Sequence, residues 1–167
     1  MQQINSVKFL KPEEIEAMKL VPMEITKQEI VSKDDIRRDA YSAVIHFSRL
    51  ANYRVPGIGS DEFALLHYAS GNPKIKNQFS MDVKVRFIET QWPKKDDREG
   101  FSTYMIQIFV NKELRWEQDL QRTGFLSVYL KGLKDGTLKG FEPLVRIPGV
   151  KEKVEPLQEE DKEKLPF

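Results

Sequence analysis

Apolar residues in the first third of the chain recur at helical spacing. Between Asp34 and Tyr53 they follow one another at steps of three and four, which places them on one face of a helix. The residues of this apolar stripe are Ile36, Ala40, Val44, Phe47 and Ala51. Pro56 follows the segment, and the residue before a proline avoids helical backbone angles. The pattern therefore predicts a helix over about residues 34–53.

Shorter helices are expected on both sides of this segment. Pro12 and Glu13 suit a first helical turn, which predicts a short helix through Met18. Residues 26–29 and 32–35 have the spacing of capping boxes, so they mark further helix starts. Additional start and stop signals, which predict one more helix, lie at Ser60, Asp61, Glu62, Gly71 and Pro73.

In the second half of the chain the apolar period falls to two. Val83, Val85 and Phe87 alternate with charged residues, as in a half-buried strand. The next expected strand is apolar on both faces and continues through a tight turn at Asn111 into a third. A helical period returns from Phe125 to Leu133. The expected strands cover residues 81–92, 101–110, 114–120 and 141–147.

These elements predict one α+β domain over residues 1–148, in which N-terminal helices pack on an antiparallel sheet. The strand–strand–strand–helix–strand order over 81–147 is also compatible with an OB-like, partly open barrel. From residue 149 the chain is rich in lysine and glutamate and nearly without large apolar groups. Residues 149–167 are therefore expected to form a flexible acidic C-terminal tail.

The amino-acid composition limits the kinds of partner, metal site and location that the chain can have. Lysine and arginine total 27 against 26 acids, so net charge alone indicates no polyanionic partner. The absence of cysteine excludes disulfides, thiolate nucleophiles and cysteine-bearing metal sites. No apolar stretch approaches the ~18–20 residues that span a bilayer, and the N-terminus lacks a signal-peptide pattern. We expect a cytoplasmic protein with no membrane association, no cofactor and no metal.

The C-terminal end is the most informative motif. An acidic-leaning run is followed by Leu165, Pro166 and Phe167 at the terminus. This ending resembles the C-terminal tip of bacterial and phage single-stranded DNA-binding proteins, although Lys162 and Lys164 dilute the acidic run. The resemblance implies a phage or mobile-element protein whose tip recruits replication or repair proteins. In such a tip the terminal ring fills an apolar pocket and its carboxylate meets a cation.

The predicted sheet offers a candidate surface for single-stranded DNA. Aromatic rings can stack on bases, and interleaved cations can neutralise phosphates. The candidate nucleic-acid-binding residues are Lys84, Arg86, Trp92, Lys94, Lys95, Phe101 and Arg115. The alternative is that a strand apolar on both faces is simply core.

Evidence for catalysis is thin, and we expect a protein that is not an enzyme. Asp61, Asp82 and Lys84 fit the loose spacing of a metal-dependent nuclease core. His46 and His67 have no second ligand at helical spacing. The leading hypothesis is a protein that binds and protects single-stranded DNA and recruits partners through its tail. A protein–protein adaptor or inhibitor and a divalent-metal nuclease are the alternatives, and the oligomeric state stays open.

Overall fold

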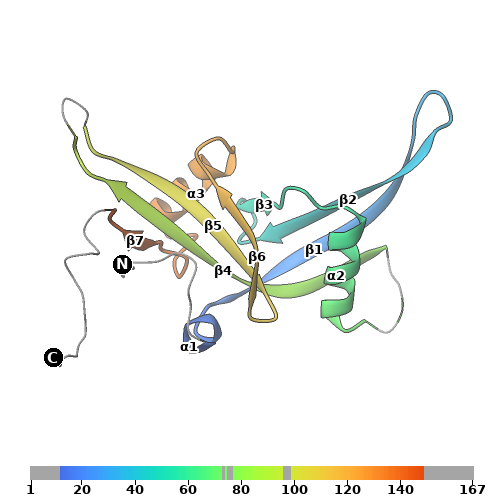
Figure 1. Ribbon diagram of the computed structural model, residues 1–167, viewed down its shortest axis with the longest axis horizontal. Helices are drawn as coiled ribbons and strands as arrows, with labels where there is room; N and C mark the ends of the chain where they lie inside the picture. The colour runs from blue at the N-terminus through green and yellow to red at the C-terminus, as the bar shows by residue number, and fades with distance from the viewer. Residues whose placement is uncertain (1–11, 73, 75–76, 96–98, 149–167) are drawn as a thin grey trace.

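The computed structural model describes residues 12–72, 74, 77–95 and 99–148 (Figure 1). The predicted tail over 149–167 lies outside the described residues, as do Leu165, Pro166 and Phe167. The described part of the chain is of mixed class and is mostly one antiparallel sheet with few helices, so the α+β prediction is confirmed at this level.

Strands β1 to β6 form a single antiparallel path in the order β3-β2-β1-β4-β5-β6. A seventh strand, β7, pairs in parallel with β4 beyond the end of β1. The strands are β1 (Leu20–Val31), β2 (Arg37–His46), β3 (Asn52–Arg54), β4 (Gln78–Trp92), β5 (Phe101–Val110), β6 (Glu113–Asp119) and β7 (Leu144–Arg146).

Three helices accompany this sheet in the described ranges: α1 (Pro12–Glu16), α2 (Ser60–Ser70) and α3 (Phe125–Asp135). Helix α2 lies between β3 and β4 in the chain and ends at Gly71, whose φ of 76° is one that glycine adopts readily. Helix α3 follows β6 and ends in the same way at Gly136. None of these helices is long and apolar enough to cross a membrane.

The helix predicted over residues 34–53 is wrong, because β2 and β3 occupy this segment. The apolar stripe that predicted the helix overlaps with a second pattern in the same segment. In this second pattern every other residue of β2 faces the core, namely Tyr41, Ala43 and Ile45. Pairing with β1 satisfies the backbone of β2 and so selects the period of two. Two helices, α1 and α2, precede β4 in the described ranges, so the correction concerns the position of the expected N-terminal helices: none of them covers residues 34–53.

The helix starts expected at 26–29 and 32–35 are also wrong, since the first segment lies inside β1 and the second forms a hairpin turn. In the turn, the Ser32 hydroxyl accepts hydrogen bonds from the backbone of Asp34 (3.3 Å) and Ile36 (3.1 Å). Serine and aspartate favour turns as well as helix caps, so the motif alone does not separate the two. Proline has no backbone N–H to donate to a neighbouring strand. Pro22 fits in β1 because the pairing of β1 with β2 begins only at Met23.

The sheet curls around a core that α3 closes. Tyr129 of α3 stacks on Phe87 of β4, with ring centroids 4.0 Å apart, and donates a hydrogen bond to the Phe141 carbonyl at 2.7 Å. At the two ends of the strand order, Tyr53 of β3 donates to the side chain of Gln118 on β6. Side chains thus join β3 to β6, and the sheet is barrel-like.

Two hairpins extend beyond this barrel-like body toward opposite ends of the molecule (Figure 1). The β1–β2 arm comprises residues 28–40, which lie beyond the pairing of β1 with β4 and of β2 with β3. The β4–β5 arm comprises residues 91–95 and 99–103, beyond the pairing of β4 with β7 and of β5 with β6. Below, the inner face of a strand is the side that packs in the core and the outer face is the other side.

Candidate functional site

An aromatic pair marks the outer face of the β4–β5 arm. Trp92 and Phe101 lie directly opposite each other in the ladder, with ring centroids 6.3 Å apart and planes 26° from parallel. Trp92 is 39% exposed and Phe101 is 56% exposed. The Trp92 indole Nε1 donates to Thr103 Oγ1 at 3.0 Å, which fixes the orientation of its ring. Such a pair offers a flat apolar surface to a solvent-borne ring system.

Two of the predicted cations adjoin this pair. Lys94 and Lys95 follow Trp92 after a single residue, Pro93, and both are exposed. The structure therefore brings together four of the seven predicted nucleic-acid-binding residues, namely Trp92, Lys94, Lys95 and Phe101. Exposed lysines beside stacked rings suit a ligand that carries both aromatic groups and anions.

Lys84 and Arg86 share the outer face of β4 with Trp92 but lie at its α1 end. Lys84 donates to the Glu16 carbonyl at 3.3 Å. Arg86 is only 7% exposed, and its Nε donates to Gln107 Oε1 at 2.6 Å across the β4–β5 ladder. These contacts indicate that Arg86 holds neighbouring elements together rather than presenting its charge to a ligand.

The electrostatics of Arg86 support this interpretation. Burial lowers the pKa of its guanidinium, whereas the charges of Glu14 and Glu117 raise that pKa. A buried guanidinium stays charged and needs acceptors, which Gln107 supplies here. Because α1 is far from β4 in the sequence, the alternation that grouped Arg86 with Trp92 could not indicate its burial.

Arg115 lies apart from the aromatic pair. It occupies the irregular step in β6 opposite Ile108 and Phe109, about 27 Å along β5 from Phe101 at ~3.4 Å per residue. Its guanidinium is 3.3 Å from the Glu113 carboxylate. Together with Trp116 and residues of α2, it lines a hollow of about 200 Å³.

The β1–β2 arm carries a second exposed surface that the helix prediction concealed. On its inner face, ion pairs join Lys27 to Asp39 (3.7 Å) and Arg37 to Glu29 (3.6 Å). On its outer face, Ile30 lies opposite Arg38. Ile36, on the same side, is 63% exposed. The outer-face positions of this arm, Gln28, Ile30, Ile36, Arg38 and Ala40, include a cation and no acid.

Between the two arms, the outer face of β1, β2 and β3 is polar. Asn52 Oδ1 accepts a hydrogen bond from His46 Nδ1 at 2.8 Å, and His46 Nε2 lies 3.5 Å from Glu24. Gln78 donates to the other Glu24 oxygen at 2.6 Å. Arg54 is exposed on the same face, opposite Val44. The alternation over β2 was the signal that could have identified this surface.

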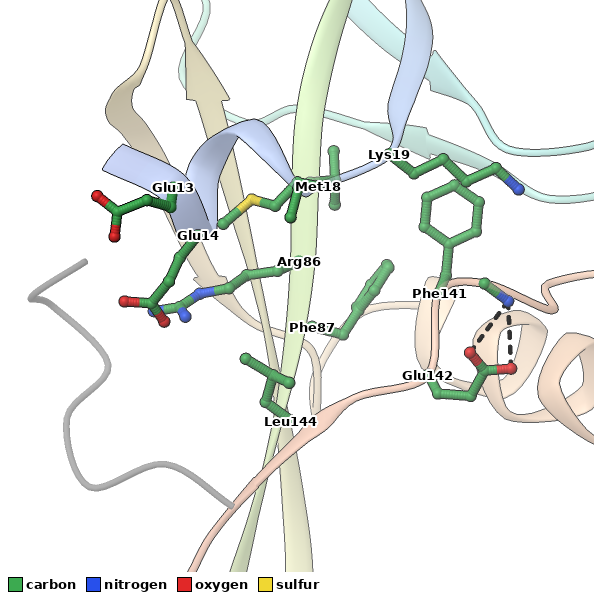
Figure 2. Close-up of a pocket in the computed structure, with 12 residues that line it drawn as sticks. Glu13, Glu14, Met18, Lys19, Arg86, Phe87, Phe141, Glu142 and Leu144 are labelled. Atoms are coloured by element: carbon green, nitrogen blue, oxygen red, sulfur yellow. Dashed lines mark hydrogen bonds between the residues drawn. The ribbon is translucent and has the colours of Figure 1, made fainter. Parts of the chain in front are cut away.

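A cleft of about 450 Å³ lies between α1, β4 and residues 140–144 (Figure 2). Its floor is apolar and includes Phe87 and Phe141, and the Lys19 ammonium lies 5.0 Å from the centre of the Phe141 ring. The cations Lys19 and Arg86 and the acids Glu13, Glu14 and Glu142 also line the cleft, and the Glu14 carboxylate lies beside the Arg86 guanidinium (Figure 2). Because acids outnumber cations here, the cleft is unfavourable for a phosphate chain.

The residues considered for a nuclease do not form a metal site in the described part of the chain. Asp82 lies on the outer face of β4 opposite Pro22. Asp61 lines the hollow beside Arg115. No group of three or more metal-ligating side chains occurs among the described residues.

Comparisons with protein-family models, curated proteins and solved structures gave no significant match.

Proposed function

We propose that this chain is a single-stranded DNA-binding protein that protects DNA and recruits partner proteins, without being an enzyme. The observation that carries the proposal is the exposed, stacked pair of Trp92 and Phe101 beside Lys94 and Lys95. Stacking of a base on an aromatic side chain contributes ~1–3 kcal/mol and is tolerant of sequence. The lysines would neutralise phosphates.

The order of the elements supports this proposal through an OB-like interpretation. An OB fold is a five-stranded, partly open Greek-key barrel with a helix between its third and fourth strands. Its β1–β2 and β4–β5 loops bind oligonucleotides. Here β1 pairs with both β2 and β4, and α2 lies between β3 and β4. The comparison therefore applies to β1–β5 rather than to residues 81–147, and the two loops correspond to the two arms.

The two arms and the face between them then define the proposed path of the strand. Bases would stack on Trp92 and Phe101, and the backbone would cross the polar outer face toward Arg38. Ile30 and Ile36 would contact bases at the β1–β2 arm. Arg54, exposed on β3, lies on this path. Lys84, Arg86 and Arg115 lie outside it and are not part of the proposed interface.

Fluorescence anisotropy with a labelled dT oligonucleotide tests the proposal. We expect tight binding that weakens steeply with salt, no cleavage with or without Mg²⁺, and much weaker binding to duplex DNA. Quenching of tryptophan emission on binding should be lost in Trp92→Phe. Absence of binding at low salt would overturn the proposal.

Partner recruitment rests on the resemblance of the last three residues. A chain lacking Phe167 should keep its affinity for dT but lose binding to the replication or repair partner, since the terminal ring and carboxylate provide the contact. A partner that binds both forms equally would contradict this role.

The adaptor or inhibitor alternative has one observation in its favour. Ile30, Val31 and Ile36 expose apolar surface on one arm, as docking surfaces for proteins do. No dT binding together with capture of a protein through this arm would favour it. Mg²⁺-dependent cleavage that disappears in Asp82→Ala would favour a nuclease.

A further inference from the structure

An exposed leucine lies in the tight loop between β2 and β3. Leu50 is 84% exposed, although such loops favour glycine, asparagine, aspartate and serine. Backbone hydrogen bonds hold the loop, since the Ala51 carbonyl accepts from the amides of Phe47 (2.9 Å) and Ser48 (3.3 Å). The Phe47 ring packs on Phe125, with ring centroids 5.6 Å apart, and so joins the loop to α3. Folding therefore fixes the backbone at Leu50 without burying its side chain.

Leu50 borders a cavity of about 260 Å³ between this loop and α3, which we call the α3 cavity. Ala51 and Val128 also line it, so the apolar part of the described lining is aliphatic. The cavity has room for one ring or branched side chain, which would also cover Leu50. Val128 lines the neighbouring hollow of about 320 Å³ beside Tyr53 as well, so a bound segment has room to continue along α3.

The cations of the α3 cavity favour an acidic ligand. Arg49 and Lys131 line it and are exposed, and neither forms an ion pair in the part of the chain that the structure describes. Asp135, the acid in the described lining, is already engaged, because its carboxylate accepts hydrogen bonds from the backbone (2.9 Å) and hydroxyl (2.7 Å) of Thr137. The lining thus combines an aliphatic hollow with two cations available to carboxylates.

We infer that the α3 cavity binds an acidic segment of a partner protein, with one large apolar side chain inside it and flanking carboxylates at Arg49 and Lys131. Charge complementarity of this kind orients a partner and speeds its association. A peptide fits this lining better than DNA, because single-stranded DNA stacks its bases on aromatic rings and the described lining has none. The site lies on the folded body, so this contact is independent of the recruitment proposed for the C-terminal end.

The length of α3 sets the size of a suitable probe. Its 11 residues extend over ~16 Å at ~1.5 Å per residue, which an extended segment matches with about five residues at ~3.4 Å each. The probe is a peptide of about nine residues, with leucine at its centre and aspartate or glutamate on both sides.

NMR titration of the full chain with this peptide locates the site and measures the affinity. The peptide should shift the backbone amides of Ala51 and Val128. A peptide with alanine at its centre should bind about tenfold more weakly, because it leaves the cavity unfilled. A peptide with the central leucine flanked by lysines should not bind, because its charges match those of Arg49 and Lys131.

Variants of exposed residues test the two parts of the lining separately. Arg49→Glu with Lys131→Glu should abolish binding of the acidic peptide, and Leu50→Ala should weaken it about fivefold. Lys134→Glu and Leu130→Ala are the matched controls, since both change exposed side chains of α3 outside the lining. Both controls should bind the acidic peptide much as the wild type does.

Contrary results overturn the inference in distinct ways. Unchanged amides at about 1 mM acidic peptide, or equal binding after both charge reversals, would rule out the α3 cavity as a peptide site. Loss of dT affinity in Leu50→Ala would assign the cavity to DNA instead. A sedimentation coefficient that rises with concentration in the wild type but not in Leu50→Ala would assign it to a second copy of the chain. Binding of dT to the wild type reports the proposed DNA interface separately, so either proposal can fail alone.

Discussion

Tyr53 of β3 donates its phenolic hydrogen to Gln118 of β6, and this bond links the first and last strands of the sheet order. The Phe125 ring of α3 packs edge-on against Tyr53, with centroids 5.3 Å apart. A cavity of about 320 Å³ lies at the same junction. The closure of the sheet at this point thus depends on side chains.

Tyr53→Phe should destabilise the fold without changing its shape. The substitution keeps the ring in the core and removes one hydrogen bond, which costs about 1 kcal/mol and also leaves the Gln118 acceptor without that donor. Urea denaturation should show a lower midpoint with an unchanged slope. Gln118→Ala combined with Tyr53→Phe should cost little more than either change alone, and full additivity would contradict the coupling.

Alkaline pH should weaken the fold through the same residue. Burial raises the pKa of Tyr53 from 10.0 to about 12. The folded state therefore holds this proton more tightly than the unfolded state, so its contribution to stability is complete below about pH 10 and is lost as the pH rises to about 12. Denaturation midpoints measured across this window should fall in the wild type. Tyr53→Phe should flatten the decline, although burial also raises the pKa of Tyr129.

Gly132 should tolerate no side chain, because Leu138 approaches α3 closely there. A Cβ on Gly132 would lie 2.6 Å from Leu138 Cγ and Cδ1, and Leu138 is fully buried. Gly132→Ala should therefore destabilise the protein by about 1–3 kcal/mol, measured by thermal or urea unfolding. Gly124→Ala is the control, since a Cβ there would have nothing within 4 Å. Equal effects of both substitutions would contradict the packing argument.

The sequence predicts local pairing better than distant contact. The pattern predicts strands over residues 81–92 and 101–110, and β4 and β5 lie there; their antiparallel register then sets Trp92 opposite Phe101. The prediction for residues 34–53 is wrong because their apolar positions fit both periods, and only the neighbouring strand decides between them. The burial of Arg86 and the separation of Arg115 depend on α1 and on the irregular step in β6, which no local pattern reveals.

Trp92→Ala and Phe101→Ala should each weaken dT binding by about 5- to 150-fold, the equivalent of ~1–3 kcal/mol for one stacked base. Since the two rings stack on each other, removing both should cost less than the sum of the single losses. Anisotropy titrations measure the affinities. The unfolding midpoints should shift little because both rings are exposed. Leu130→Ala, which also removes an exposed apolar side chain, should leave DNA affinity unchanged.

Substitutions of lysine and arginine on and near the β4–β5 arm should affect either DNA binding or folding stability. Lys94→Ala with Lys95→Ala should reduce the salt dependence of dT binding, lowering the slope of log K against log salt by about 1.4, or ~0.7 for each phosphate that the protein no longer neutralises. Folding stability should not change, since both lysines are exposed.

Arg86→Ala should do the reverse. It leaves Gln107, which is fully buried, without its Arg86 donor, so the unfolding free energy should fall by about 2–4 kcal/mol while the salt slope stays the same. A reduced slope for Arg86→Ala, with normal stability, would mean that Arg86 contacts DNA after all.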